Sequence, residues 1–370
     1  MNYDNRTAGE EFDDENLQIT KESVIEEQTN EQESKLQNDE ETIHIIKNRL
    51  DSSVSDFEDR EEEQFSLIDS RYVIGNPSGT FYQKPNGLSQ QNMPFFRNDN
   101  VSDALQLGSS LLLAASSKGS LHQSGTSPRQ DSYAYGVFEQ GEEKWIILAI
   151  SDGVSASPYS HILAEYLTFS SVKELKLQLK TTNTFEIQDF AIKINEMAND
   201  FCKKQLVKQN QHFDVEKYSA QMGANYFGTT LECAVIHLEK DKSSVTHFTI
   251  SGDGGAYIFN KSLAINVVKS GKTRGEDIVS NAVSPLPLDS INEINITKVD
   301  LEEGDIFFIT TDGLADFIGN GNSNLGNFLL KKLIDVKDSV EFLKIINVSM
   351  FQLDDDKTAI CFKIGDVDYG

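Results

Sequence analysis

Aspartate residues recur at the ends of apolar runs of strand length. Asp152 follows IILAIS, Asp253 follows FTISG and Asp312 follows FFITT, and each of the three precedes a glycine. Asp131 precedes SYAYGVF, and Asp355, with a second aspartate beside it, precedes TAICFKI. One aspartate next to a buried strand is ordinary turn chemistry, but the position is costly for a charge. Several such aspartates in one domain therefore predict that the strand ends converge.

Converging carboxylates repel one another unless a cation neutralises them. Hard oxygen ligands without a cluster of histidine and cysteine favour Mg²⁺ or Mn²⁺ over zinc. The pattern of aspartates therefore predicts a divalent-metal site at the strand ends.

The elements that must position these aspartates are apolar runs rich in Ile, Val, Phe and Thr, which predict strands. The predicted strands cover 109–117, 144–150, 229–238, 244–250, 256–260, 305–310 and 358–364. Helical spacing of apolar residues predicts helices at 160–180, 189–209 and 324–346, the last broken near Lys337 and Asp338. Strands arrive in consecutive pairs and helices as long insertions. This order predicts an α+β fold with stacked sheets.

The chain divides into parts of different composition. Residues 1–66 hold 21 acidic and 6 basic side chains, which predicts a disordered acidic segment. Residues 67–106 have the composition of a linker that is ordered in places, and residues 107–366 form the predicted domain that holds the metal site. The acidic segment is either a solubilising tail or an arm that binds a partner or is autoinhibitory.

The overall charge restricts the partners. The 370 residues carry a formal net charge of −26, which disfavours nucleic acid and anionic membranes as partners. No apolar run reaches the length of about 18 residues that a membrane span needs. The first residues lack the pattern of a secretory signal, and three scattered cysteines form no disulfide framework. We therefore expect a cytoplasmic protein.

The order and context of the aspartate motifs resemble the metal-dependent protein phosphatases, the type 2C serine/threonine phosphatases, and especially a bacterial branch of that family. Six segments carry the resemblance: GSLHQSGTSPRQDSYAYG (119–136), LAISDGVSASPYSHILAEYL (148–167), FGTTLECAVI (227–236), ISGDGGAYIF (250–259), ITTDGLADFI (309–318) and QLDDDKTAICF (352–362). Single segments are weak signals, but these follow the family's order. Gly254 departs from the family pattern, which usually has serine there.

The resemblance implies a four-layer αββα sandwich, in which two antiparallel sheets are flanked by helices, with two divalent cations at one end. It implies that Asp152 bridges the cations and that the carbonyl of Gly153 is a further ligand. Asp312 and Asp355 would complete the first position, and Asp131 would ligate a cation or hold water. Gln130 replaces a glutamate of many relatives. Asp253 and Asp316 match positions linked to a third, weaker cation.

Two residues are candidates for binding the phosphate, because the arginine that binds it in many relatives is missing here. His122 is the first candidate and Arg129 the second; the alternatives are a structural histidine and a surface cation. The basic segment 269–277 is either a flap over the site or a solvated loop.

The implied activity is hydrolysis of phosphoserine and phosphothreonine in proteins by metal-activated water, with Asp131, Asp152 and Asp312 as the catalytic residues. Partners would be phosphorylated proteins and a cognate serine/threonine kinase in signalling. The cysteines lie outside any Cys-x5-Arg loop, which argues against a cysteine-dependent phosphatase. The alternative is a catalytically silent relative that binds phosphoproteins or regulates a partner.

Overall fold

The computed structural model describes residues 65–68, 71–74, 98–124, 127–141, 143–210, 213–239, 242–270, 284–292 and 294–365, all within the unit Gln64–Gly370. The predictions for residues 1–64 and for residues 271–277 of the basic segment lie outside these residues.

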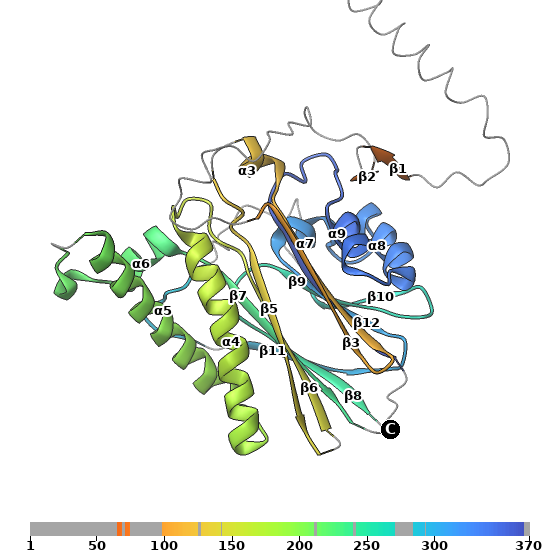
Figure 1. Cartoon of the computed structure of the whole chain (residues 1–370), viewed down its shortest axis with the longest axis horizontal. Coiled ribbons are helices and arrows are strands. Elements are labelled where there is room, and N and C mark those ends of the chain that lie inside the picture. Colours follow the sequence, from red (N-terminus) through yellow and green to blue (C-terminus); the bar gives the residue numbers. More distant parts are fainter. Residues whose placement is uncertain are drawn as a thin grey trace, which may run out of the picture. The chain divides into compact units, whose positions relative to one another are not determined.

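Two antiparallel sheets are stacked on one another (Figure 1). The six-stranded sheet has the order β10-β9-β12-β13-β4-β3, and the five-stranded sheet has the order β11-β8-β7-β6-β5. The strands are β3 (Asn100–Leu107), β4 (Ser110–Ser117), β5 (Ser132–Gln140), β6 (Glu143–Ser151), β7 (Leu231–Leu238), β8 (Ser243–Ser251), β9 (Gly255–Phe259), β10 (Ile265–Lys269), β11 (Asn295–Leu301), β12 (Ile306–Thr310) and β13 (Lys357–Lys363). β1 (Phe65–Ile68) and β2 (Arg71–Ile74) form a sheet of their own.

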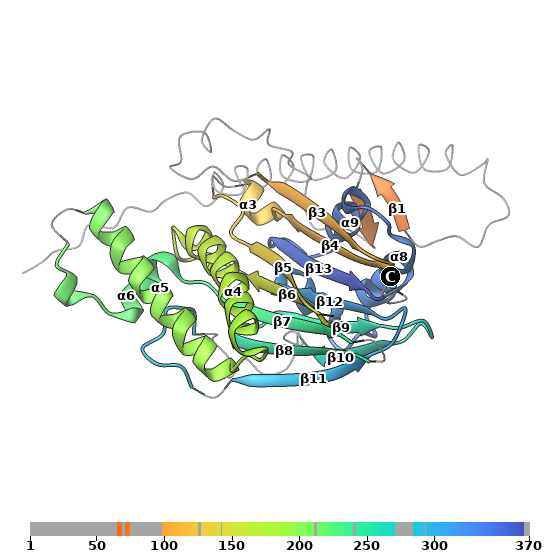
Figure 2. The ribbon, with the colours of Figure 1, turned by 60° about the horizontal axis from the view of Figure 1, so that its bottom comes forward.

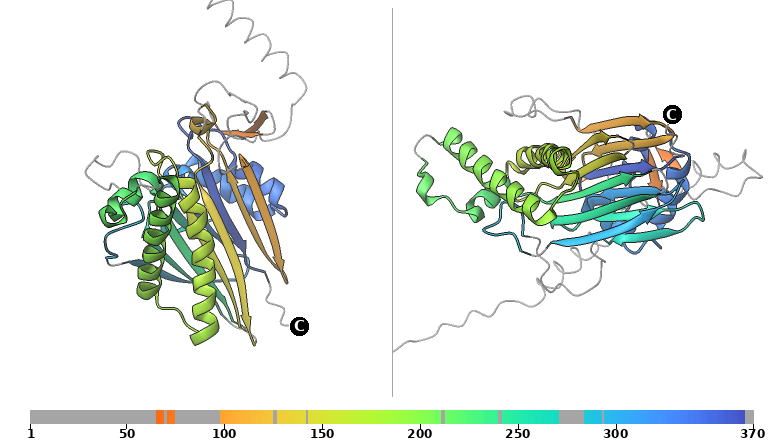
Figure 3. Two further views of the ribbon diagram at one scale, coloured as in Figure 1. Left: turned by 60° about the vertical axis from the view of Figure 1, so that its left-hand side comes forward. Right: turned by 90° about the horizontal axis from the view of Figure 1, so that it is seen from below.

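Helices cover the outer face of each sheet (Figures 1 and 3). The helices are α3 (Ser120–Ser124), α4 (Ser160–Thr182), α5 (Ile187–Gln209), α6 (Ala220–Phe227), α7 (Asp312–Ile318), α8 (Asn324–Asp335) and α9 (Ser339–Ile346), with a short 3-10 turn at Val215–Lys217. Helices α4 to α6 pack on the five-stranded sheet and α7 to α9 on the six-stranded sheet. None of the described helices is both long and apolar enough to span a bilayer.

Inner strands such as β4, β6 and β12 are buried at nearly every position because both faces of each sheet are covered. In β4, Leu112 and Ala114 lie between the sheets, whereas Leu113 and Ala115 contact the layer of helices α7 to α9. Successive side chains of a strand point to opposite faces, so a strand without polar positions requires cover on both sides. The predicted four-layer αββα sandwich is thereby confirmed.

The break in the predicted helix 324–346 is also confirmed, because α8 ends at Asp335 and α9 begins at Ser339. Asp338 caps the N-terminus of α9. Asp338 accepts hydrogen bonds from the backbone N–H groups of Val340 and Glu341, at 2.9 and 2.8 Å. These are donors that the first turn of α9 would otherwise leave unpaired.

Several elements were not predicted. β3 lies in the predicted linker 67–106 and pairs with β4 along its whole length, so the sheet begins before residue 107 (Figure 2). β11 is a partly exposed edge strand of polar composition, NITKVDL. Helices α6 and α7 have only eight and seven residues, too short for a clear helical period. The division into 1–66, 67–106 and 107–366 stays a prediction.

Replacing Phe308 by alanine should lower the free energy of unfolding by about 3–5 kcal/mol. Phe308 is fully buried and packs edge-on against Phe259 and Phe342, with ring centroids 5.7 and 6.4 Å apart. Urea denaturation followed by circular dichroism measures the loss. The exposed Phe169 provides the matched control, because Phe169→Ala should change stability by less than about 0.5 kcal/mol. Equal losses in both variants would contradict the assigned packing.

Candidate metal centre

Strand pairing brings the aspartates to one end of the sandwich. In the five-stranded sheet Ser132 pairs with Ser151, so the residues just outside this pair, Asp131 and Asp152, adjoin at the same edge. In the six-stranded sheet the end of β12 adjoins the start of β13, and this places Asp312 near Asp355. In an antiparallel pair, the end of one strand lies beside the start of its neighbour. This is why some of the aspartates follow their strands and others precede them.

Three of the predicted ligands meet closely. One carboxylate oxygen from each of Asp152, Asp253 and Asp312 lies within 4.8 Å of the other two. Asp131 and Asp355 lie near enough to raise the pKa of both Asp152 and Asp312. Thus both sheets contribute carboxylates to one cluster.

Two other predicted positions adjoin this cluster. Asp316 lies one turn beyond Asp312 on α7, and its charge also raises the pKa of Asp312. Gly153 is buried, and its backbone forms an isolated β-bridge with Thr229.

Hydrogen bonds from threonines hold the cluster in place. Thr311 Oγ1 donates to Asp131 Oδ2 at 2.8 Å. The backbone N–H of Asp152 donates to Thr230 Oγ1 at 2.8 Å, and the carbonyl of Asp152 accepts from Thr229 Oγ1 at 2.7 Å. The residues just before β7 therefore fix the backbone of Asp152, and the residue just after β12 fixes the side chain of Asp131.

Close approach of backbone segments requires glycine at the start of α7. A Cβ at Gly313 would lie 1.9 Å from the carbonyl oxygen of Asp356. No side chain fits there, so α7 and the segment before β13 can pack only through this glycine. The glycine after Asp312 thus serves packing as well as the turn.

The cluster is electrostatically strained without a cation. Burial, followed by the charges of Asp356 and Asp355, raises the pKa of Asp131 to about 7. Burial, followed by Asp253 and other carboxylates, raises the pKa of Asp312 to about 8. Burial and the neighbouring Asp312 raise the pKa of Asp152 well above its usual value. Each shift means that the protein environment disfavours the charged form.

The donor set fits divalent cations. Carboxylate oxygens dominate the cluster, and hard oxygen donors are the ligands that Mg²⁺ and Mn²⁺ prefer. Gln130 has a buried Oε1 with no hydrogen-bond partner among the described residues, while its Nε2 donates to Ser160 Oγ. A buried acceptor requires a partner such as an ordered water or an ion. A bound cation would neutralise the clustered carboxylates.

Asp356 has a structural position, in contrast to its neighbour Asp355. Asp356 is 2 % exposed and accepts from the backbone N–H groups of Gly119 and Gln130, at 2.7 and 2.6 Å. His122 Nδ1 lies 3.0 Å from Asp356 Oδ1. Burial opposes the charged form of each partner, but their contact outweighs it and lowers the pKa of Asp356 while raising that of His122. Asp356 therefore ties the segment 119–130 to the start of β13.

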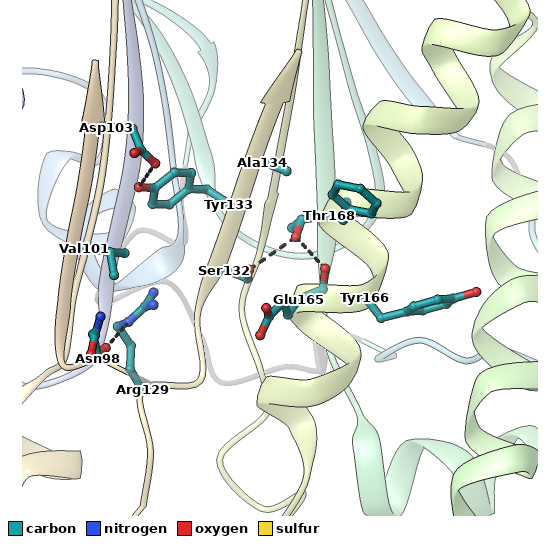
Figure 4. Close-up of a pocket in the computed structure, with 11 residues that line it drawn as sticks. Asn98, Val101, Asp103, Arg129, Ser132, Tyr133, Ala134, Glu165, Tyr166 and Thr168 are labelled. Carbon is teal, nitrogen blue, oxygen red and sulfur yellow. Dashed lines mark hydrogen bonds between the residues drawn. The ribbon is translucent and has the colours of Figure 1, made fainter. Parts of the chain in front are cut away.

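Arg129, the second phosphate-binding candidate, is also engaged within the protein. It is 4 % exposed, and its guanidinium donates to the backbone carbonyls of Asn98 and Asp131, at 3.1 and 2.9 Å, and to Ser116 Oγ. Figure 4 shows it at one side of a cavity of about 550 Å³ between β3, β5 and α4. The cavity is lined by Asn98, Val101, Asp103, Arg129, Ser132, Tyr133, Ala134, Glu165, Tyr166, Thr168 and Phe169, and so by none of the clustered aspartates. Phosphate binding by His122 or Arg129 stays a prediction.

Sequence reasoning missed some residues that support the site. The sequence patterns place Thr230 only within the predicted strand 229–238 and Thr311 only in the run FFITT before Asp312, and they give Asp356, the aspartate beside Asp355, no role of its own. Glu232 was not singled out, although a carboxylate within the apolar run LECAVIHL is itself a signal of a buried charged partner.

Comparison with known proteins agrees with this geometry. A model of the Protein phosphatase 2C family matches residues 118–367, and the chain belongs to that family. No curated protein matches the chain in sequence.

Several solved structures resemble the chain. A crystal structure of RsbX in complex with magnesium is 16 % identical over 72 % of this chain and 100 % of that one, with a TM-score of 0.38. The S. agalactiae serine/threonine phosphatase is 16 % identical, over 72 % of this chain and 99 % of that one, with a TM-score of 0.43. The catalytic domain of PstP, in complex with two manganese ions, is 14 % identical, over 70 % of this chain and 99 % of that one, with a TM-score of 0.42.

The metal-free protein should lose stability as the pH rises from about 4 to about 8. Free aspartate titrates near 3.8, whereas Asp131 and Asp312 titrate near 7 and 8 in the fold. Between these values the folded state holds more protons than the unfolded state, so its stability falls with increasing pH. Urea denaturation in the presence of chelator at pH 5 and pH 8 measures the difference. Saturating Mn²⁺ should reduce the fall, and a metal-free protein that is more stable at pH 8 would contradict the assigned cluster.

Asp355→Asn is expected to affect cation binding, whereas Asp356→Asn is expected to affect the stability of the fold. Asp355→Asn should abolish the increase in melting temperature that Mn²⁺ produces, because Asp355 is half-exposed at the cluster. Asp356→Asn should lower stability by about 3–5 kcal/mol, because it disrupts a buried charged network, but should keep the Mn²⁺-dependent increase. Differential scanning fluorimetry with and without Mn²⁺ measures both effects. The reverse pattern would make Asp356 the ligand.

Proposed function

We propose that the chain is a metal-dependent protein phosphatase that hydrolyses phosphoserine and phosphothreonine. The observation that carries the proposal is the convergence of Asp152, Asp253 and Asp312 within 4.8 Å at one end of the sandwich. Membership of the protein phosphatase 2C family supports metal-dependent phosphatase chemistry at this position.

The proposed ligands are divided between two cation positions and a weaker third. Asp152 and the carbonyl of Gly153, with Asp312, Asp355 and Asp131, would hold two Mn²⁺ or Mg²⁺ ions. Asp253 and Asp316 would contribute to the third position. When bound, such cations activate water for attack on phosphorus and neutralise charge on the phosphoryl oxygens.

The chain's own residues orient these ligands. Thr311 holds the side chain of Asp131 by its hydroxyl, and Thr230 holds the backbone of Asp152, so neither ligand has to reorganise during the reaction. Asp131, Asp152 and Asp312 are the proposed catalytic residues. His122 and Arg129 are the proposed contacts to the phosphate. To reach it, either side chain would first have to break its present bonds within the protein.

The proposed biological setting follows from the activity. The substrates would be phosphorylated proteins, and a serine/threonine kinase would act on the same substrates in a cytoplasmic signalling process. The acidic N-terminal segment 1–66, with 21 acidic and 6 basic side chains, would bind a partner.

A silent binding module is the second candidate. It is favoured by the burial of His122 and Arg129, both bonded to other groups of the protein. It would retain cation binding and bind a phosphoprotein without turning it over.

The full chain should release phosphate from a phosphothreonine peptide and from p-nitrophenyl phosphate with Mn²⁺ or Mg²⁺, and chelator should abolish the release. Loss of a residue that only supports a metal ligand typically lowers activity by about 10–100-fold. Asp152→Asn and Asp312→Asn remove proposed ligands themselves, so each should lower kcat/KM by more than that. Asp335→Asn, at the exposed end of α8, is the matched control and should have no effect.

The outcomes separate the two candidates. Activity that survives both substitutions would refute the assigned site. A folded chain that binds Mn²⁺ and phosphopeptide but releases no phosphate would support the silent module.

A further inference from the structure

A buried carboxylate lies between the two sheets, close to the metal cluster. Glu232 on β7 is 2 % exposed and shares the inward face of its strand with Ala234 and Ile236, which belong to the core between the sheets. A carboxylate in such a layer is costly unless charged partners neutralise it. The partners of Glu232 are therefore informative.

The partners come from both sheets. Lys269 Nζ, on edge strand β10 of the six-stranded sheet, donates to Glu232 Oε1 at 2.5 Å. His247 Nε2, on the neighbouring strand β8, lies 3.2 Å from Glu232 Oε2. Burial opposes the charged form of Glu232, but His247 and Lys269 outweigh it and lower the pKa of Glu232. A charged contact thus links the two sheets at this point.

The same contact holds the turn that carries Asp253. Lys269 Nζ also donates to the carbonyl oxygen of Gly252, at 3.3 Å. Gly252 has a φ of +146°, which favours glycine, and a Cβ there would lie 3.1 Å from Glu232 Oε1. Lys269 therefore bonds to the residue before Asp253, while the carboxylate of Glu232 lies against it.

Glu232 also lies close to the residue after Asp253, Gly254. A Cβ at Gly254 would lie 2.9 Å from Glu232 Oε1 and 2.5 Å from the carbonyl oxygen of Thr310. The serine usual in the family would first collide with the Thr310 carbonyl, so the close approach of the backbone at Thr310 requires glycine at 254, and the carboxylate of Glu232 lies beside that glycine. Asp253 is thus flanked on both sides by residues that lie against the Glu232 carboxylate.

We propose that Glu232 and Lys269 are positioning residues that orient Asp253 and thereby set the affinity of the cation position to which Asp253 contributes. The inference rests on the proposed function, in which Asp253 is a cation ligand. Lys269 bonds to the backbone just before Asp253, and the carboxylate of Glu232 lies beside Gly252 and Gly254. A backbone restrained in this way leaves less freedom for the carboxylate of Asp253 to lose on binding. Partners that orient a metal ligand typically change metal affinity by about 10–100-fold.

The test is a Mn²⁺ titration of the full chain, with free Mn²⁺ followed by electron paramagnetic resonance. Lys269→Met and Glu232→Gln should weaken the weakest binding phase by about tenfold or more and leave the tighter phases unchanged. Lys269→Arg should restore much of the affinity. Lys261→Met, which removes the exposed ion pair of Lys261 with Glu303 just beyond the other end of β9, is the matched control and should behave as the wild type.

A double-mutant cycle distinguishes positioning from general stabilisation. Asp253→Asn should remove the same weak phase, and Lys269→Met should have no further effect in that background. If Lys269→Met weakened all phases equally, or left the titration unchanged while the wild type bound Mn²⁺, the inference would be overturned. A wild-type chain that binds no Mn²⁺ would instead refute the proposed function itself.

Discussion

Repulsion among buried carboxylates is the constraint on which the rest of this structure depends. Asp131, Asp152 and Asp312 lie in a cluster where burial and mutual charge raise the pKa of each. Such a cluster opposes folding unless the remaining contacts outweigh it or a cation neutralises it. The extensive apolar core on both faces of both sheets supplies the stability that lets this cluster form.

Neutral and charged hydrogen-bond partners keep the cluster ordered. Thr311, just after β12, and Thr230, just before β7, bond to Asp131 and Asp152 without adding charge. Asp356, in contrast, takes two backbone N–H groups and His122, and these keep its pKa low. Adjacent aspartates in the sequence thus have different tasks, because one faces the cluster and the other faces backbone donors.

The departure from the family pattern at Gly254 has a structural reason. A Cβ there would lie 2.5 Å from the backbone carbonyl of Thr310 and 2.9 Å from the carboxylate of Glu232. Glu232 in turn requires Lys269 and His247, since a lone carboxylate between two sheets would be unstable. Gly254 therefore lies beside a network that spans both sheets.

The sequence alone determined the fold class, most strands and the aspartates at the strand ends, because apolar runs and their boundaries are local patterns. It also indicated the break at Asp338, since capping is a local interaction as well. Only the tertiary structure decided how Asp355 differs from Asp356, and why Arg129 is buried beside Asn98. It also decided which charges meet Glu232. These contacts join residues far apart in the chain, and no local pattern specifies which backbone donors or charged side chains the folded strands will bring together.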